Sequence, residues 1–186
     1  MTKKALVLLA EGFEEVEAVT PIDVLRRAGI EVTVASLGAK QVKGAHDIIV
    51  VADTTLTEVR GEFDALVLHG GSPGAANLAG SPEVKQLIQN YFKAGKFIAA
   101  ICAAPAVVLA PTGILKGKRA TCFPGCEKDF GKEVTFVKDS VVIDGNVITS
   151  RGLGTAHAFS LAIVGKLLGP QEEKKLGERT LAMAEV

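Results

Sequence analysis

The sequence lacks the features that mark nucleic-acid-binding proteins. It contains no Trp, only 5% of its residues are aromatic, and 21 basic residues balance 21 acidic ones. Without a basic excess a chain has little attraction for a phosphate backbone, and with few aromatic side chains it offers little surface on which bases stack. Specific binding to nucleic acid is therefore not expected.

Long apolar runs and a disulfide pattern are absent as well. No stretch approaches the roughly 20 apolar residues that span a bilayer. Residues 5–10 follow two lysines as in a signal peptide, but Glu11 ends this run and no small-residue cleavage site follows. The three cysteines are Cys102, Cys122 and Cys126. An odd and small number of cysteines fits a reducing compartment, so we expect a cytoplasmic protein without membrane association.

The residues that are present are typical of one folded domain. Hydrophobic residues make up 48% of the chain and charged residues 23%, which excludes disorder. A length of 186 residues falls within the range of a single domain, and a core of this size needs no covalent cross-links. We expect residues 1–186 to form one α/β domain.

Five short apolar segments predict buried strands. Each holds four to six residues and most are rich in β-branched residues or leucine, as in strands covered on both faces. The segments are residues 5–10, 32–35, 48–52, 65–68 and 97–101. They predict a mostly parallel sheet with helices on both faces.

Helical patterns separate these segments. A first helix ends in two arginines before Gly29, and Pro21 either kinks it or marks its start. Ser81, Pro82 and Glu83 form a typical helix start for a second helix that ends at Gly95. Three more helices are predicted at residues 106–110, 155–168 and 172–184. Residues 134–149 predict antiparallel strands with a hairpin turn at Asp144-Gly145.

Residues of three chemical kinds directly follow three of the predicted strands. The sequence EGFEEVE occupies residues 11–17, HGGSPG residues 69–74 and CAAP residues 102–105. In open parallel sheets, ligands bind outside the carboxyl ends of the strands. An acidic cluster, a glycine-rich loop and a cysteine are therefore expected to converge at one edge of the sheet.

Cys102 is the candidate nucleophile of this edge. It lies where a buried strand turns abruptly into a helix, a position that exposes a nucleophile and lets the helix N-terminus favour a thiolate. The alternative is a small buried hydrophobic residue, the common fate of a free cysteine. The backbone N–H groups of the Gly70-Gly71 pair and of Ala103 are candidate donors to an oxyanion, although strand-end glycines also form ordinary loops.

Among the acidic residues, Glu17 is the candidate partner of Cys102. A charged carboxylate next to the sulfur would oppose thiolate formation, so a useful glutamate must be largely protonated and share one proton with the thiol. Glu11, Glu14 and Glu15 are expected to face solvent at a helix N-terminus.

The chain resembles the ThiJ/PfpI superfamily, and within it the branch of the human parkinsonism-associated deglycase and bacterial YajL. The segments that carry the resemblance are ALVLLA at residues 5–10, EEVE at 14–17, DVLRRAGI at 23–30, Gly70-Gly71, AAICAAP at 99–105 and TSRGLGT at 149–155. The resemblance implies a flavodoxin-like fold and a homodimer. It also implies an oxidation-sensitive nucleophile at Cys102, hydrogen-bonded to Glu17, with backbone donors at Gly71 and Ala103.

Several positions depart from the pattern of this superfamily. His69 replaces a proline and is a possible proton shuttle at the edge of the site, beside Gly70 and Glu14. Phe123 stands where many animal relatives have a histidine, and His46 where relatives often have an arginine. These departures affect the expected substrate preference more than the expected fold.

Other types of site are not supported. Protease-like members have a histidine after the nucleophile, whereas this chain has Ala103, and no His-Glu pair of a glutamine amidotransferase is visible. Cys122 and Cys126 lack partners for a tetrahedral metal site, so we interpret them as structural residues or auxiliary oxidation sites.

Two functional hypotheses follow from the resemblance. The first is an enzyme without metal or cofactor that acts on small reactive carbonyls or glycated substrates, as a glyoxalase that converts methylglyoxal to lactate or as a deglycase. The second is a redox sensor or chaperone of the oxidative-stress response, in which Cys102 is oxidised to a sulfinate that Glu17 stabilises.

Overall fold

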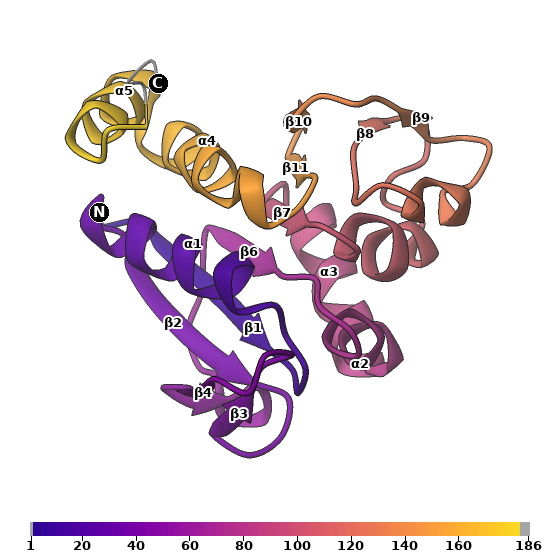
Figure 1. Ribbon diagram of the computed structural model, residues 1–186, viewed down its shortest axis with the longest axis horizontal. Helices are drawn as coiled ribbons and strands as arrows, with labels where there is room; N and C mark the ends of the chain where they lie inside the picture. Colours follow the sequence, from indigo (N-terminus) through magenta and orange to yellow (C-terminus); the bar gives the residue numbers. More distant parts are fainter. Residues whose placement is uncertain (1, 183–186) are drawn as a thin grey trace.

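A computed structural model of the chain describes residues 2–182 and is built around one large sheet (Figure 1). Its strands are β1 Lys4–Leu9, β2 Glu31–Ser36, β5 Thr54–Thr55, β6 Ala65–Leu68, β7 Phe97–Ile101, β10 Val141–Asp144 and β11 Val147–Ser150. They are ordered β10-β11-β7-β6-β1-β2-β5, and only the pair β10–β11 is antiparallel. The order of the five long parallel strands is that of a flavodoxin-like sheet, in which the chain reverses its direction of winding next to β1.

Helices cover both faces of this sheet. Their bounds are α1 Glu15–Arg27, α2 Gly74–Gly80, α3 Pro82–Lys93, α4 Ala156–Leu168 and α5 Pro170–Arg179. Buried residues of α1, α4 and α5 pack with Ala5, Val7 and Leu9 of β1. Those of α2 and α3 pack with Leu6 and Leu8 of the same strand. Successive β1 side chains thus enter two separate cores, which explains why this strand is apolar throughout.

The predicted strand at residues 48–52 is not part of the large sheet. Its central part forms β4 Ile49–Val51, which pairs antiparallel with β3 Gln41–Lys43 in a separate two-stranded sheet. The Ile49 and Val51 side chains are 59% and 65% exposed. The prediction of a buried parallel strand is therefore wrong here, because an apolar run does not by itself reveal what covers it.

The segment after residue 118 is only partly as predicted. The hairpin β10–β11 is confirmed, with Asp144 paired to Val147 and a turn at Gly145-Asn146, one residue later than predicted. By contrast, β9 Thr135–Phe136 pairs in parallel with β8 Arg119–Ala120 in a second small sheet. The expected antiparallel pairing of residues 134–137 is therefore wrong, since local patterns do not specify a strand's partner.

Three helix predictions need correction. The helix α1 begins at Glu15, so Pro21 lies inside it and does not mark its start. A π-helix at Pro105–Leu109 replaces the regular helix predicted at residues 106–110. The last helix, predicted at residues 172–184, is observed as α5, which ends at Arg179; residues 183 and 184 lie outside the described part of the chain.

The remaining two helices agree with the sequence. The Ser81 hydroxyl accepts the backbone N–H of Val84 at 3.2 Å at the start of α3, and α4 covers the predicted residues 155–168 almost completely. Within residues 2–182, each helix is too short or too polar to cross a bilayer.

Candidate functional site

Three segments that are distant in the sequence meet at the carboxyl edge of the central strands. Glu17 lies in the first turn of α1, Gly70 follows the end of β6, and Cys102 is the first residue after β7. Since β1, β6 and β7 are parallel neighbours, the connections that leave them emerge side by side. The structure therefore brings together the acidic cluster, the glycine pair and the cysteine.

The backbone of Cys102 is held on both sides in a left-handed conformation. Its φ angle is 66°, which is uncommon for a residue other than glycine. The Cys102 N–H donates to the carbonyl of Ser150 at 3.0 Å, and its own carbonyl accepts the N–H of Phe123 at 2.8 Å. These two hydrogen bonds fix the abrupt turn that carries the thiol out of the strand into a half-buried position.

Glu17 is buried beside this thiol. Its side chain Oε2 accepts the N–H of Gly70 at 3.0 Å, and the carboxyl group also forms a hydrogen bond with Cys102. Only 1% of the Glu17 surface is exposed. A Cβ atom at Gly70 would lie 2.6 Å from Cys102 Cβ and 2.7 Å from Glu17 Oε2, so the close approach of these groups requires glycine.

Burial controls the protons of this pair. Desolvation raises the pKa of Glu17 to about 7, against the hydrogen bonds from Cys102 and Gly70 that favour its charged form. Burial and the neighbouring Glu17 carboxylate likewise raise the pKa of the Cys102 thiol. Both effects oppose a state in which Glu17 and Cys102 are negatively charged at the same time, so the two groups share a proton.

The expected stabilisation of the thiolate by a regular helix is not what the structure provides. The segment after Cys102 enters a short π-helix, and burial outweighs the favourable contacts. The contacts that do lower the thiol pKa are the backbone N–H groups of Ala103 and Gly71, which hydrogen-bond to the sulfur. Both donors named from the sequence therefore face the reactive atom.

Glu14 and Glu15 are buried, contrary to the expectation that they face solvent, whereas Glu11 is exposed. Glu15 accepts the backbone N–H of His46 at 2.7 Å and contacts its ring Nδ1 at 2.9 Å. Together with Glu14 these residues place three possible metal-ligand atoms within 4.8 Å of one another. The ion pair that His46 forms with Glu15 already accounts for this arrangement.

His69 lies inside the core next to the site. Only 1% of its surface is exposed, its ring meets that of Phe13 edge-on at 5.6 Å, and burial lowers its pKa to about 4. The ring is therefore neutral near pH 7, and its Nδ1 donates to the carbonyl of Gly70 at 2.7 Å. This contact positions Gly70, while burial removes His69 from the solvent with which a proton shuttle exchanges.

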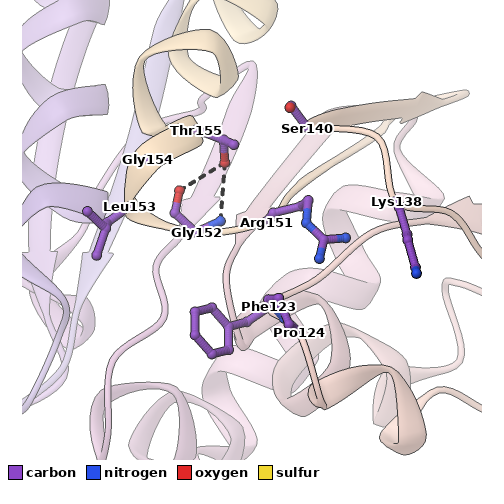
Figure 2. Close-up of a pocket in the computed structure, with 9 residues that line it drawn as sticks. All are labelled: Phe123, Pro124, Lys138, Ser140, Arg151, Gly152, Leu153, Gly154 and Thr155. Carbon is purple, nitrogen blue, oxygen red and sulfur yellow. Dashed lines mark hydrogen bonds between the residues drawn. The ribbon is translucent and has the colours of Figure 1, made fainter.

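A surface pocket of about 460 Å³ is lined in part by Phe123, the residue whose N–H donates to the Cys102 carbonyl (Figure 2). The residues that line it are Phe123, Pro124, Lys138, Ser140, Arg151, Gly152, Leu153, Gly154 and Thr155. Of these residues, Phe123 was noted from the sequence, whereas no role was predicted for Arg151 or Lys138. Arg151 directly follows β11, so the rule that ligands bind outside strand carboxyl ends predicts it as well when applied to this strand.

Known proteins are similar to this chain in both sequence and fold. The sequence profile of the DJ-1/PfpI family matches residues 3–166. Protein dj-1beta of Drosophila melanogaster is 43% identical over 184 residues, which cover 97% of this chain and 98% of that protein. The crystal structure of Drosophila melanogaster DJ-1beta has a TM-score of 0.93 to this chain, with the same coverage of both chains.

Two further relatives bear descriptive names. The glutathione-independent glyoxalase DJR-1.2 of Caenorhabditis elegans is 40% identical over 177 residues, or 94% of each protein. Oxidized DJ-1 of Toxoplasma gondii is 35% identical and has a TM-score of 0.93, covering 97% of this chain and 98% of that one. The similarity therefore extends over all the segments that form the site.

Proposed function

The chain belongs to the DJ-1/PfpI family, and on this premise we propose that it is an enzyme that uses Cys102 to convert small reactive carbonyls without a cofactor. The observation that carries this proposal is the buried pair of Glu17 and Cys102, joined at Gly70. A carboxyl group with a pKa of about 7 can both give and take a proton near neutral pH. A relative named as a glutathione-independent glyoxalase supports the same reaction class.

The reaction begins with addition of the Cys102 sulfur to the aldehyde carbon of an α-oxoaldehyde such as methylglyoxal. A carbon–sulfur bond forms, the aldehyde oxygen receives the shared proton, and the Gly71 and Ala103 amides stabilise the negative charge that develops there. Glu17 then removes the hydrogen of this carbon as a proton and returns it to the neighbouring carbon, while the hydroxyl proton on the first carbon moves to the ketone oxygen. The ketone thus becomes a hydroxyl group, and the first carbon becomes the carbonyl of a thioester.

The product of this transfer is a thioester of a 2-hydroxy acid on Cys102. Water cleaves the carbon–sulfur bond, releases the acid and restores the thiol. In sum, one methylglyoxal and one water give one lactic acid, so no external oxidant or reductant takes part. An early glycation adduct of an amine would enter the same sequence and release its amine as the leaving group, which corresponds to a deglycase.

The decisive experiment follows lactate formation from methylglyoxal in the absence of any added thiol. We expect Cys102→Ser and Glu17→Leu to lower kcat/KM by roughly a hundredfold or more, since each removes a group that acts on the reacting carbon. Cys126→Ser, which changes a thiol outside the site, is the matched control and should turn over as the wild type does. Retention of most activity by Cys102→Ser would disprove the proposal.

A second candidate function is redox sensing through the same thiol. The Glu17 carboxyl group lies where it would donate a hydrogen bond to an oxidised sulfur, and one structural relative is an oxidized DJ-1. Two equivalents of peroxide would convert the Cys102 thiol to a sulfinic acid and release two waters. If wild type and variants alike fail to form lactate, oxidation by peroxide confined to Cys102 favours this function, including a chaperone regulated by oxidation.

We also propose that the protein is a homodimer. Val16 and Val19, three residues apart on one face of α1, are 45% and 43% exposed. Ile48, whose N–H donates to Glu15 at 3.4 Å, extends this apolar surface toward β4. A second copy that covers these side chains would remove them from water. The three free thiols fit a reducing compartment such as the cytoplasm.

A further inference from the structure

The pocket next to Cys102 shares its walls with the reactive pair. The N–H of Phe123 donates to the Cys102 carbonyl at 2.8 Å, and the backbone of Leu153 forms a hydrogen bond with the Glu17 carboxyl group. A Cβ atom at Gly152 would lie 3.8 Å from Glu17 Oε1. A molecule whose carbonyl group reacts at Cys102 can therefore extend directly into this pocket.

Two cationic side chains, those of Arg151 and Lys138, line this pocket. Figure 2 shows the Arg151 guanidinium extending from the end of β11 into the space between Phe123 and Lys138. Within residues 2–182, neither Arg151 nor Lys138 has a carboxylate within 4.0 Å. The pocket thus presents positive charge that is not consumed by an ion pair in the described chain.

The Arg151 guanidinium also has an unused hydrogen-bond donor. Its Nη1 atom is buried and has no hydrogen-bond partner within the described residues. A buried charged donor without a partner destabilises the folded state. The planar guanidinium group matches the oxygen spacing of a phosphate or a carboxylate, with which it forms two parallel hydrogen bonds.

The nearby carboxylate of Glu127 leaves this donor free. Backbone hydrogen bonds from Glu127 itself and from Gly125 lower its pKa the most, and the charges of Arg151 and Lys138 have a smaller effect. The Glu127 side chain accepts the N–H of Gly125 two residues before it. It therefore weakens the positive potential of the pocket without occupying the position that an anion would take.

The loop on the other side of the pocket is already ordered. The Thr155 hydroxyl accepts the N–H of Gly152 at 3.1 Å and donates to the carbonyl of the same residue at 2.9 Å. These bonds fix residues 152–155 next to Arg151 (Figure 2). A ligand therefore meets a preformed wall, which reduces the entropy cost of binding.

From these observations we propose that Arg151 and Lys138 form a subsite for the phosphate or carboxylate group of the substrate, so that the carbonyls which react at Cys102 carry an acidic tail. This inference rests on the proposed function for the reacting end of the molecule. A volume of about 460 Å³ is large for methylglyoxal and suits a longer molecule whose charged end lies at Arg151.

The first test measures binding without any reaction. Glycerol 3-phosphate and succinate, which carry no reactive aldehyde, are titrated calorimetrically into wild type, Arg151→Gln and Lys138→Gln. We expect each variant to weaken binding roughly tenfold or more, because a charge-assisted hydrogen bond is lost. Lys132→Gln removes the same charge from the exposed Lys132, outside the pocket, and should bind as the wild type does.

The titration decides the proposal whichever variant folds well. Lys138 is exposed, so Lys138→Gln tests the subsite even if Arg151→Gln is poorly folded, and circular dichroism identifies such a failure. Phosphate binding alone would assign the subsite to phosphate esters, and succinate binding alone to carboxylates. No binding by wild type, or equal binding by wild type and both pocket variants, overturns the proposal.

The second test compares turnover of α-oxoaldehydes with and without an acidic tail. Hydroxypyruvaldehyde phosphate and 4,5-dioxopentanoate are compared with neutral methylglyoxal. We expect the preference for the anionic compounds, as a ratio of kcat/KM values, to fall roughly tenfold in Arg151→Gln. If the compounds are turned over but Arg151→Gln leaves the ratio of kcat/KM values unchanged, the subsite is overturned and the proposed function stands. If glycerol 3-phosphate or succinate binds but no compound is turned over, the subsite is supported and the proposed function is contradicted.

Discussion

At the scale of the residue, the buried carboxyl group of Glu17 links the chemistry of the site to the stability of the fold. Glu17 ionises in the unfolded chain near pH 4.5 but in the folded protein only at about pH 7, because burial disfavours its charge. The folded state therefore holds this proton more tightly than the unfolded state. Below pH 4.5 the group is protonated in both states and costs nothing.

A loss of stability is expected as the pH rises from 4.5 through 7. Over this range the unfolded chain releases the Glu17 proton before the folded protein does. The free energy of unfolding therefore falls, by on the order of 3 kcal/mol once the group is ionised in both states. Urea unfolding at about pH 5 and pH 8 should show that wild type loses more free energy of unfolding than Glu17→Gln. Glu62→Gln, at an exposed side chain, should behave as wild type. Parallel curves for wild type and Glu17→Gln would contradict this assignment.

The sequence predicts some of these residues better than others. The rule that ligands bind at strand carboxyl ends was sufficient to bring together the acidic residues 11–17, the Gly70-Gly71 pair and Cys102, because it depends only on where strands end. The role of Glu17 as the partner of Cys102 came from the family resemblance. The rule did not reveal that Glu14 and Glu15 are buried. Their burial depends on contacts with residues such as His46, 31 positions beyond Glu15 in the chain, and local patterns carry no information about such contacts.

At the scale of the element, the turn between β7 and the π-helix is the most constrained segment of the site. A positive φ angle at Cys102 costs roughly 1–2 kcal/mol relative to glycine. The hydrogen bonds of its N–H to Ser150 and of its carbonyl to Phe123 maintain this conformation. Cys102 thus presents its thiol from a backbone conformation that is unfavourable for any residue with a Cβ atom.

This strain can be measured with two variants that both lack the thiol. Cys102→Gly is expected to be about 1 kcal/mol more stable than Cys102→Ala, because glycine adopts the positive φ without strain, partly offset by its more flexible unfolded chain. Ala103→Gly, at the next residue where φ is not positive, should instead destabilise the protein. Urea unfolding provides all three values. A Cys102→Ala variant that is the more stable of the pair would show that the turn is relaxed.

Elements were predictable where the local sequence determines them. Ser81 and Pro82 start α3 wherever the helix packs, because the Ser81 hydroxyl accepts a backbone N–H of the first turn and Pro82 has no N–H that needs a partner. The strand β4 and the π-helix at Pro105–Leu109 were misread because their form depends on their neighbours. An apolar segment such as residues 48–52 has the same pattern whether it is buried in a sheet or lies at a surface.

At the scale of the whole molecule, the exposed apolar side chains of α1 provide a test of assembly. If the proposed homodimer forms there, wild type elutes with twice the mass of one chain in size-exclusion chromatography with light scattering. Glutamates in the double variant Val16→Glu/Val19→Glu would be buried without partners and should reduce the mass to that of a monomer.

The control for assembly lies on another part of the surface. Ile143, 39% exposed on the edge strand β10, is not part of the α1 surface, so Ile143→Glu should leave the mass unchanged. A monomeric wild type, or a double variant with the mass of the wild type, would contradict dimerisation through α1.

The alternation of β1 side chains has a consequence for how the molecule unfolds. Ala5, Val7 and Leu9 belong to one core, and Leu6 and Leu8 to the other. Neither layer of helices can detach without exposing one face of the strand that supports the opposite layer. The two cores are therefore energetically coupled through a single backbone, and the chain should lose both in one cooperative, all-or-none transition.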